Sequence, residues 1–245
     1  MLVEACVDSI ASALAAQSGG ASRVELCADL VEGGTTPSAG TIAVVRERLH
    51  IPLFVIIRPR GGDFLYSLEE RDAMRRDIAQ AKELRADGVV IGALNADGTV
   101  DQRVVRELVE EARPMRVTFH RAFDLTRDRE EALETLVSLG VDRILTSGGA
   151  PTAIEGADAL AALVARSADR MTVMAGGGVT EANVAELVSR SSVPEVHVRV
   201  AERRESAMRH RNERIVFGKP YTPDEYGRLE TSAERVRRVL EALRA

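Results

Sequence analysis

Two short motifs place a carboxylate next to a thiol at the same spacing. Glu4 and Cys6 form the first E-x-C motif, and Glu25 and Cys27 repeat it twenty-one residues later. Each motif lies in a short apolar run that predicts a β-strand, and the separation matches one strand–helix repeat, so neighbouring parallel strands would carry the thiols. Strands pair about 4.8 Å apart, so two inward thiols at one height can share a soft ion such as Cu(I) or Zn(II).

The segment VTFHRAFD, residues 117–124, begins like a strand and ends on polar groups. His120 falls at the strand end, and Arg121 and Asp124 belong to the loop that follows. An imidazole at a strand end suits a general acid. Arg121 is predicted to bind a ligand, and the alternative is that Arg121 and Asp124 pair with each other or cap the next helix.

A second polar stretch, RPRGGDF at residues 58–64, follows another predicted strand. Arg58 and Arg60 can hold a carboxylate or phosphate through paired N–H groups, with Asp63 beside them. The alternative is a glycine turn closed by an Arg–Asp ion pair.

Glycine-rich loops follow the later strands and lead into helices. One contains Ser147 and Gly148, and the next contains Gly176 and Gly177. Backbone N–H groups in such loops often bind phosphate near the last strands of (β/α)8 barrels. These residues are therefore predicted to contribute to an anion site.

The elements that must position these groups alternate regularly along the chain. Short apolar runs separated by helical periodicity predict eight strands, at residues 2–7, 23–27, 52–58, 88–94, 115–120, 142–147, 171–176 and 195–200. Eight strands alternating with helices favour a closed (β/α)8 TIM barrel in a single domain over residues 1–245. The alternative, a doubly wound sheet, lacks a GxGxxG motif after its first strand. Residues 200–230 are expected to form a long loop, and residues 231–244 the last helix.

The two-residue period of a strand assigns a face to each side chain. Outward positions must be apolar because they pack on helices, whereas polar groups can face inward where the barrel opens at its carboxyl end. The apolar residues of five strands occupy one parity, which leaves the polar ones inside. The residues predicted to face the barrel mouth are Glu4, Cys6, Glu25, Cys27, Arg58, Thr118, His120, His197 and Arg199.

Composition excludes several classes of function. The net charge is −5 and aromatic residues make up 3% with no Trp, which disfavours nucleic acid and anionic membranes as partners. No apolar run approaches the roughly 18 residues of a membrane span, and the N-terminus does not resemble a signal peptide. Two cysteines cannot form a disulfide framework, so a cytoplasmic protein with reduced thiols is expected.

Together these motifs resemble the CutC family. The segments that carry the resemblance are VEACVDS, SRVELCADLVEGGTTPS, IIRPRGGDF, VTFHRAFD, RILTSGG, MAGGGV and SAMRHRN. The resemblance implies a (β/α)8 barrel, usually cytoplasmic and often a homodimer or higher homo-oligomer, with a role in copper homeostasis and Cu(I) bound at Cys6 and Cys27. One departure is Arg199, which follows His197 where the family tends to have small residues.

Two functions are therefore predicted. The first is copper homeostasis with Cu(I) held by Cys6 and Cys27. The second is an enzyme acting on a small anionic metabolite, with Arg58 and Arg60 orienting the anion. In that enzyme Glu4 or Glu25 would act as general base and His120 as general acid. A copper carrier needs its cysteines, whereas an enzyme needs Glu25 and His120.

Overall fold

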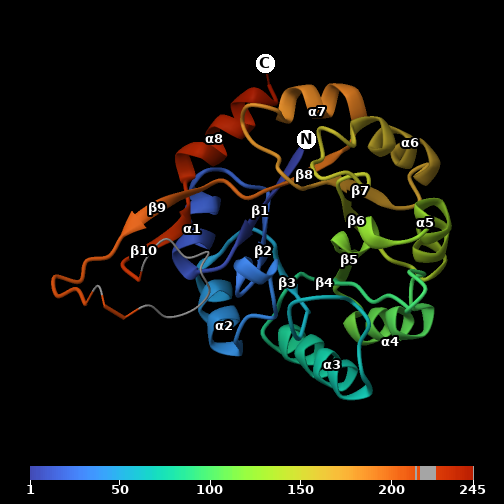
Figure 1. The fold of residues 1–245 in the computed structure, drawn as a ribbon, viewed down its shortest axis with the longest axis horizontal. Helices are drawn as coiled ribbons and strands as arrows, with labels where there is room; N and C mark the ends of the chain where they lie inside the picture. Colours follow the sequence, from blue (N-terminus) through green and yellow to red (C-terminus); the bar gives the residue numbers. More distant parts are fainter. Residues whose placement is uncertain (213, 216–224, 245) are drawn as a thin grey trace.

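The eight predicted strands form a closed parallel barrel. The computed structural model describes residues 1–212, 214–215 and 225–244, and its barrel strands pair in chain order until β8 closes on β1 (Figure 1). The strands are β1 (Leu2–Val7), β2 (Arg23–Leu26), β3 (Leu53–Ile56), β4 (Gly88–Ile91), β5 (Arg116–Phe119), β6 (Arg143–Thr146), β7 (Thr172–Ala175) and β8 (Glu195–Val198). The predicted (β/α)8 barrel in a single domain is confirmed.

Helices surround the barrel, as Figure 1 shows. They are α1 (Ile10–Ser18), α2 (Ala39–Arg48), α3 (Leu68–Glu83), α4 (Gln102–Ala112), α5 (Arg129–Ser138), α6 (Ala157–Ser167), α7 (Val184–Ser191) and α8 (Ala233–Ala242). Six of them begin after a residue whose side chain accepts a backbone N–H of the first turn, namely Ser9, Ser38, Ser67, Asp101, Asp128 and Ser232. Such caps satisfy donors that the helix itself leaves free.

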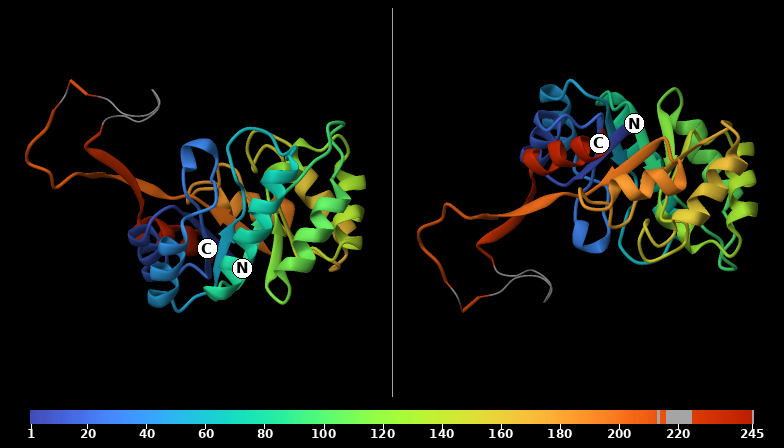
Figure 2. Two further views of the ribbon diagram at one scale, coloured as in Figure 1. Left: turned by 90° about the horizontal axis from the view of Figure 1, so that it is seen from below. Right: turned by 90° about the horizontal axis from the view of Figure 1, so that it is seen from above.

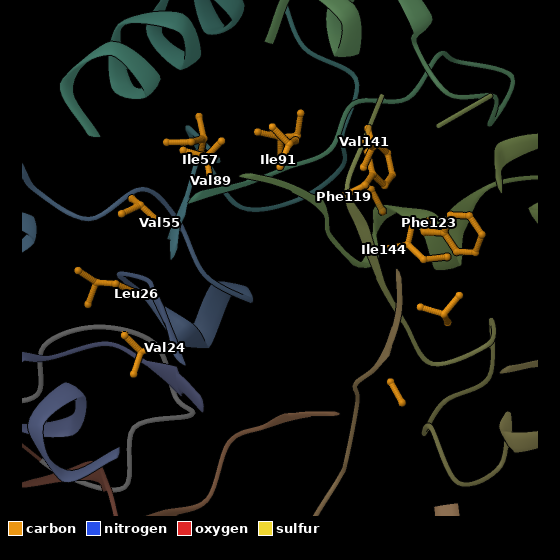
Figure 3. Close-up of a cluster of buried hydrophobic side chains, with 14 of the residues drawn as sticks. Val24, Leu26, Val55, Ile57, Val89, Ile91, Phe119, Phe123, Val141 and Ile144 are labelled. Carbon is orange, nitrogen blue, oxygen red and sulfur yellow. The ribbon is translucent and has the colours of Figure 1, made fainter. Parts of the chain in front are cut away.

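The barrel wall separates two apolar regions. Outward side chains from every strand form one large buried cluster with the helices, and Figure 3 shows part of it, including Val24, Leu26, Val55 and Ile57. A second, small cluster inside the barrel contains both cysteines with Phe54, Ile56 and Val90. The assignment of strand faces from the two-residue period is therefore confirmed for β1, β2 and β3.

The strand register brings the two E-x-C motifs and His197 together. Cys6 of β1 lies opposite Glu25 of β2, and Glu4 of β1 lies opposite His197 of β8. Because β8 closes the barrel against β1, residues almost two hundred positions apart in sequence become neighbours.

The segment after β8 differs from the long loop expected over residues 200–230. It contains β9 (Ala201–Glu205) and β10 (Gly227–Thr231), which pair antiparallel, and Figure 2 shows this ribbon projecting away from the barrel. Ion pairs between alternating Arg and Glu side chains accompany the strands, such as Arg228–Glu230 at 2.5 Å. Since β10 ends at Thr231 and Ser232 caps the last helix, α8 begins at Ala233. No helix in the described part of the chain is long and apolar enough to cross a membrane.

Candidate functional site

A pocket of about 260 Å³ opens among the residues at the carboxyl ends of the strands. It is lined by Cys6, Glu25, Glu32, Gly33, Ile56, Arg58, Phe64, His120, Arg121, Leu145 and His197. Most of the residues predicted to face the mouth are among them. A hollow of about 330 Å³ near Asp101 and Arg127 contains none of the predicted site residues. The mouth pocket is therefore the candidate site.

The two thiols lie together but differ in access. Cys6 Sγ and Cys27 Sγ are 3.9 Å apart and both residues are buried, yet only Cys6 lines the pocket. A hydrogen bond from the Cys27 thiol lowers the pKa of Cys6 to about 5 against the effect of burial, and His197 contributes further. The same hydrogen bond and burial raise the pKa of Cys27 well above its usual value. Cys6 is therefore the thiol that ionises first.

The donor set fits a soft metal ion. Metal–sulfur bonds are about 2.3 Å long for zinc, so two sulfurs within roughly 4.6 Å of each other can bind one ion. The 3.9 Å separation meets this condition. Single ligand atoms from Cys6, Cys27 and Glu25 lie within 4.8 Å of one another, so a carboxylate oxygen is available as a third donor. Sulfur ligands select Cu(I) or Zn(II) over harder ions.

His197 connects the thiols to the carboxylates. Its Nδ1 lies 2.8 Å from Glu4 Oε1, and its Nε2 lies 3.6 Å from Glu25 Oε2. Burial alone would lower the pKa of His197, but hydrogen bonds with Cys6 and Glu4 raise it well above its usual value. Burial likewise opposes ionisation of Glu4, but the His197 hydrogen bond and the Arg23 charge lower the pKa of Glu4 to about 2. The imidazolium therefore donates Nδ1–H to an ionised Glu4.

A buried charge network lies below this group, at the amino ends of the strands. Arg23 pairs with both Glu4 and Glu195, and Arg143 pairs with Glu195 with an Nε–Oε2 distance of 2.5 Å. Arg143 also donates to Thr118 Oγ1 at 3.0 Å. Glu4 is consequently held by Arg23 and His197, and of the two carboxylates in the E-x-C motifs only Glu25 lines the pocket. Burial and the negative charge of Cys6 raise the pKa of Glu25.

Sequence reasoning missed Arg23, Arg143 and Glu195. A signal was present, because Arg23 has the parity of Glu25 on β2, and Glu195 has the parity of His197 on β8. These residues begin their strands, where an inward charge lies in the barrel interior rather than at its mouth.

His120 lines the pocket with one ring nitrogen satisfied and the other free. Its Nδ1 accepts the backbone N–H of Ala122 at 3.1 Å, which places the ring proton on Nε2. Nε2 is buried, and no group in the described residues accepts its proton. Burial and the nearby Arg58 charge lower the pKa of His120 to about 3, so the imidazole is neutral. An unsatisfied buried donor costs about 1–3 kcal/mol, which a ligand acceptor can recover.

Gly92 makes room for this imidazole. A Cβ at residue 92 would lie 2.2 Å from His120 Cε1, much closer than van der Waals contact. Phe64 packs on the other side, with its ring centroid 4.8 Å from that of His120. The ring is therefore held between β4 and the loop after β3.

The backbone N–H groups of the loop after β6 donate to acceptors within the protein. The carboxylate of Asp124 accepts the backbone N–H groups of Ser147 and Gly149 at 3.0–3.1 Å, and the Gly148 N–H goes to Thr146 Oγ1. Arg121 is fixed by Asp124 and by Ser147 Oγ, at 2.7 and 2.9 Å. Arg121 and Asp124 therefore pair with each other, as one of the two predictions for Arg121 stated. Arg121 also lines the pocket.

The remaining predicted residues occupy different surroundings. Arg58 lines the pocket and donates to the carbonyl oxygens of Glu32, Gly34 and Gly62 at 2.6–2.8 Å.

Arg60 pairs with Asp63 and Glu70 on the surface and does not line the mouth pocket. Gly176 donates to the Thr146 carbonyl, and Gly177 lies against Arg121. Arg199 is exposed and does not line the mouth pocket.

The fold and site define a (β/α)8 barrel with paired thiols and an acid–base group at its mouth. Comparison with known proteins assigns this barrel to a family: the CutC family model matches residues 1–201, and the chain belongs to the CutC family. The CutC protein of Chromobacterium violaceum is 51% identical over 99% of this chain and 98% of its own length. The copper homeostasis protein cutC homolog of Homo sapiens is 46% identical over 96% of this chain and 86% of its own length.

Solved structures agree with this assignment. The crystal structure of the protein CutC from Streptococcus agalactiae matches with a TM-score of 0.78 and 35% identity, covering 80% of this chain and 97% of that one. A phosphoribosylanthranilate isomerase from Thermotoga maritima matches with a TM-score of 0.58 at 12% identity, over 100% of this chain and 99% of that one. The second match shows the barrel fold alone.

Proposed function

We propose that this protein serves copper homeostasis by binding Cu(I) through Cys6 and Cys27. The observation that supports the proposal is the 3.9 Å separation of the two sulfurs on adjacent strands inside the barrel. Cu(I) is a soft ion that two thiolates can hold, and the cytoplasm in which we expect this protein keeps both thiols reduced.

The two cysteines have different tasks in this proposal. Cys6 lines the pocket and its pKa of about 5 leaves it ionised at neutral pH, so an incoming ion meets this sulfur first. Cys27 is 2% exposed and supplies the second sulfur from the interior of the barrel, and binding of the ion displaces its thiol proton to solvent. Glu25 is the available third donor.

Anaerobic titration with Cu(I) in the presence of a competing chelator tests this assignment. We expect the wild-type protein to take up one ion per chain, and the Cys6→Ser/Cys27→Ser variant to lose that uptake. A His120→Asn variant keeps both sulfurs and serves as the control, with uptake equal to wild type. Equal uptake by the double-serine variant would contradict the proposal.

A second candidate function is an enzyme acting on a small anionic metabolite. The observation that favours it is the unsatisfied Nε2–H of His120 in the wall of a pocket that also contains Glu25 and Arg121. Glu4 is committed to Arg23 and His197, so Glu25 is the better general base of the two predicted carboxylates. With a pKa of about 3, His120 is a neutral hydrogen-bond donor rather than a charged acid. Metabolite screening by thermal shift on wild type and Glu25→Gln tests for binding. Measuring the loss of any bound metabolite over time in both proteins tests for turnover, which Glu25→Gln should lose.

We further expect a homodimer or higher homo-oligomer. The support is the ribbon of β9 and β10, which projects from the barrel in Figure 2 and carries exposed apolar side chains such as Leu229, 50% exposed. Light scattering coupled to size-exclusion chromatography measures the molar mass, and a mass of one chain would contradict this expectation.

A further inference from the structure

The walls of the mouth pocket differ in charge. One side carries Cys6, Glu25 and His197, and the segments that follow β3 and β5 contribute Arg58, His120 and Arg121. Glu32, whose carbonyl oxygen accepts from Arg58, also lines the pocket. Apolar side chains, Ile56, Phe64 and Leu145, complete the lining. A pocket with cationic and neutral donors on one side and an acid–base group on the other suits a small polar molecule with an anionic end.

Three donors on the cationic side have capacity for a ligand, and the first is Arg58 Nε, which is buried and has no acceptor among the described residues. His120 Nε2–H has no acceptor among the described residues, and its tautomer is fixed because Nδ1 accepts the Ala122 N–H. Arg121 uses Nε for Asp124 and Nη2 for Ser147, which leaves Nη1 without a partner in the described part of the chain. The Arg121 side chain is 43% exposed, so its free edge is accessible.

The state of His120 narrows the ligand class. Its pKa of about 3 keeps the imidazole neutral, so it donates to a carbonyl or hydroxyl oxygen without adding charge. A neutral imidazole that polarises a carbonyl is an established catalytic device in (β/α)8 barrels. The positive charge is supplied by Arg121, whose planar guanidinium suits a carboxylate.

Phosphate fits this site less well than carboxylate. Phosphate sites in barrels depend on several backbone N–H groups of the late loops. Here Asp124 accepts the N–H groups of Ser147 and Gly149, and Gly148 donates to Thr146. The protein's own carboxylate thus occupies two backbone donors of the loop after β6. The pocket volume of about 260 Å³ also lies just below the range of about 300–1,000 Å³ typical for drug-sized ligands.

We infer that the barrel mouth binds a small 2-oxo- or 2-hydroxycarboxylate, whose carboxylate pairs with Arg121 and whose adjacent oxygen accepts the Nε2–H of His120. This site gives a ligand class to the second candidate function but requires neither turnover nor copper. Its failure and the failure of copper binding are therefore measured separately.

Calorimetric titration of wild-type protein with pyruvate, L-lactate, acetate and inorganic phosphate tests the inference. We expect saturable binding of pyruvate or L-lactate at millimolar concentrations or below, with acetate and phosphate binding more weakly. His120→Asn keeps an acceptor for the Ala122 N–H but is too short to place a donor at the position of Nε2, and Arg121→Gln lacks the charge. Each should weaken pyruvate binding about tenfold or more, the loss expected for one hydrogen bond to a charged or well-placed group.

Two matched controls separate the site from general effects. Arg116→Gln alters an exposed arginine at the opposite end of β5, and His50→Asn alters an exposed histidine outside the pocket. Both should bind pyruvate like wild type. In wild-type protein, pyruvate should also shift the NMR resonance of the His120 ring N–H.

Three outcomes would overturn the inference. They are the absence of saturable binding by pyruvate and L-lactate, equal binding by His120→Asn and wild type, and phosphate binding as tight as that of either probe. Acetate provides a further check, because its binding should fall in Arg121→Gln but not in His120→Asn.

Discussion

The lower interior of the barrel and its mouth both contain buried polar side chains, but these side chains differ in whether their hydrogen-bonding groups have partners. In the lower interior, Arg23, Arg143, Glu4 and Glu195 satisfy one another through ion pairs. At the mouth, His120 keeps a buried N–H that no described residue accepts. Closed networks contribute to a defined barrel interior, whereas an unsatisfied group in a pocket is available to a ligand.

The difference follows position along the strands. Arg23, Arg143 and Glu195 are the first residues of β2, β6 and β8, and His120 follows the end of β5. Inward charges at the amino ends are enclosed by the barrel and must pair, whereas those at the carboxyl ends meet the pocket. A function can therefore be assigned to an inward polar residue only when its position along the strand is known as well as the face on which it lies.

The largest expected effect on stability comes from removing one residue of the ion-pair network in the lower interior of the barrel. Arg23→Met leaves Glu4 without one partner and weakens the pairing of Glu195 in a buried setting, so we expect a loss of about 3–5 kcal/mol in the free energy of unfolding. Urea denaturation followed by circular dichroism measures this loss. Arg76→Met is the control, because the Arg76 side chain is 78% exposed and its removal should change stability by less than about 0.5 kcal/mol. Similar losses in the two variants would show that the buried network contributes little.

An intermediate effect is expected from crowding His120. Gly92→Ala places a Cβ 2.2 Å from His120 Cε1, so the ring must move, at a cost of about 1–3 kcal/mol. Pyruvate binding should fall together with stability. Gly40→Ala in α2 is the matched control, since its Cβ would have no neighbour closer than 3.9 Å and should change stability by no more than about 1 kcal/mol. Unchanged pyruvate binding in Gly92→Ala would contradict the placement of His120 in the ligand site.

The neutral state of His120 predicts a pH dependence. Its folded pKa of about 3 lies below the unfolded value of about 6.5, so below pH 6.5 the unfolded chain binds a proton that the native protein does not. Above that pH His120 is neutral in both states and makes no contribution to the pH dependence of stability. The free energy of unfolding should therefore decrease as the pH is lowered from about 6.5 to about 3. This residue contributes up to about 1.4 kcal/mol of that decrease per pH unit.

Comparison with His120→Asn isolates this contribution from that of other titrating groups. The free energy of unfolding, measured at several pH values below 6.5, should fall less steeply in the variant. Parallel curves for the two proteins would show that folding does not lower the pKa of His120.

The smallest effect concerns the two thiols. Cys6 lines the pocket and is 7% exposed, whereas Cys27 is 2% exposed. A short pulse of iodoacetamide on native protein should modify Cys6 before Cys27, as read by mass spectrometry of proteolytic fragments. Equal labelling of both residues in the native protein, with unfolded protein as the reference for full reactivity, would contradict the different access of the two sulfurs.

Much of the candidate site was predictable because strands impose a simple rule. Alternation placed Glu4, Cys6, Glu25 and His120 inside, and the E-x-C spacing placed two thiols on adjacent strands. The hydrogen-bond partners of Asp124 were not predictable. Whether its carboxylate contacts the loop that contains Ser147 or solvent depends on the distance between two βα loops. Arg60 and Arg58 are two positions apart and chemically alike, yet Arg60 pairs on the surface while Arg58 lines the pocket.

The sequence by itself determined the barrel, the strand faces and the family motifs, because these depend on local periodicity and on spacing along the chain. Only the tertiary structure decided which groups satisfy one another. Closure of β8 on β1 joins His197 to Glu4, and the pairing of Arg23 with Glu195 bridges strands that are distant in sequence. Hydrogen bonds and ion pairs depend on distances of a few ångströms between such segments, and periodicity carries no information about those distances.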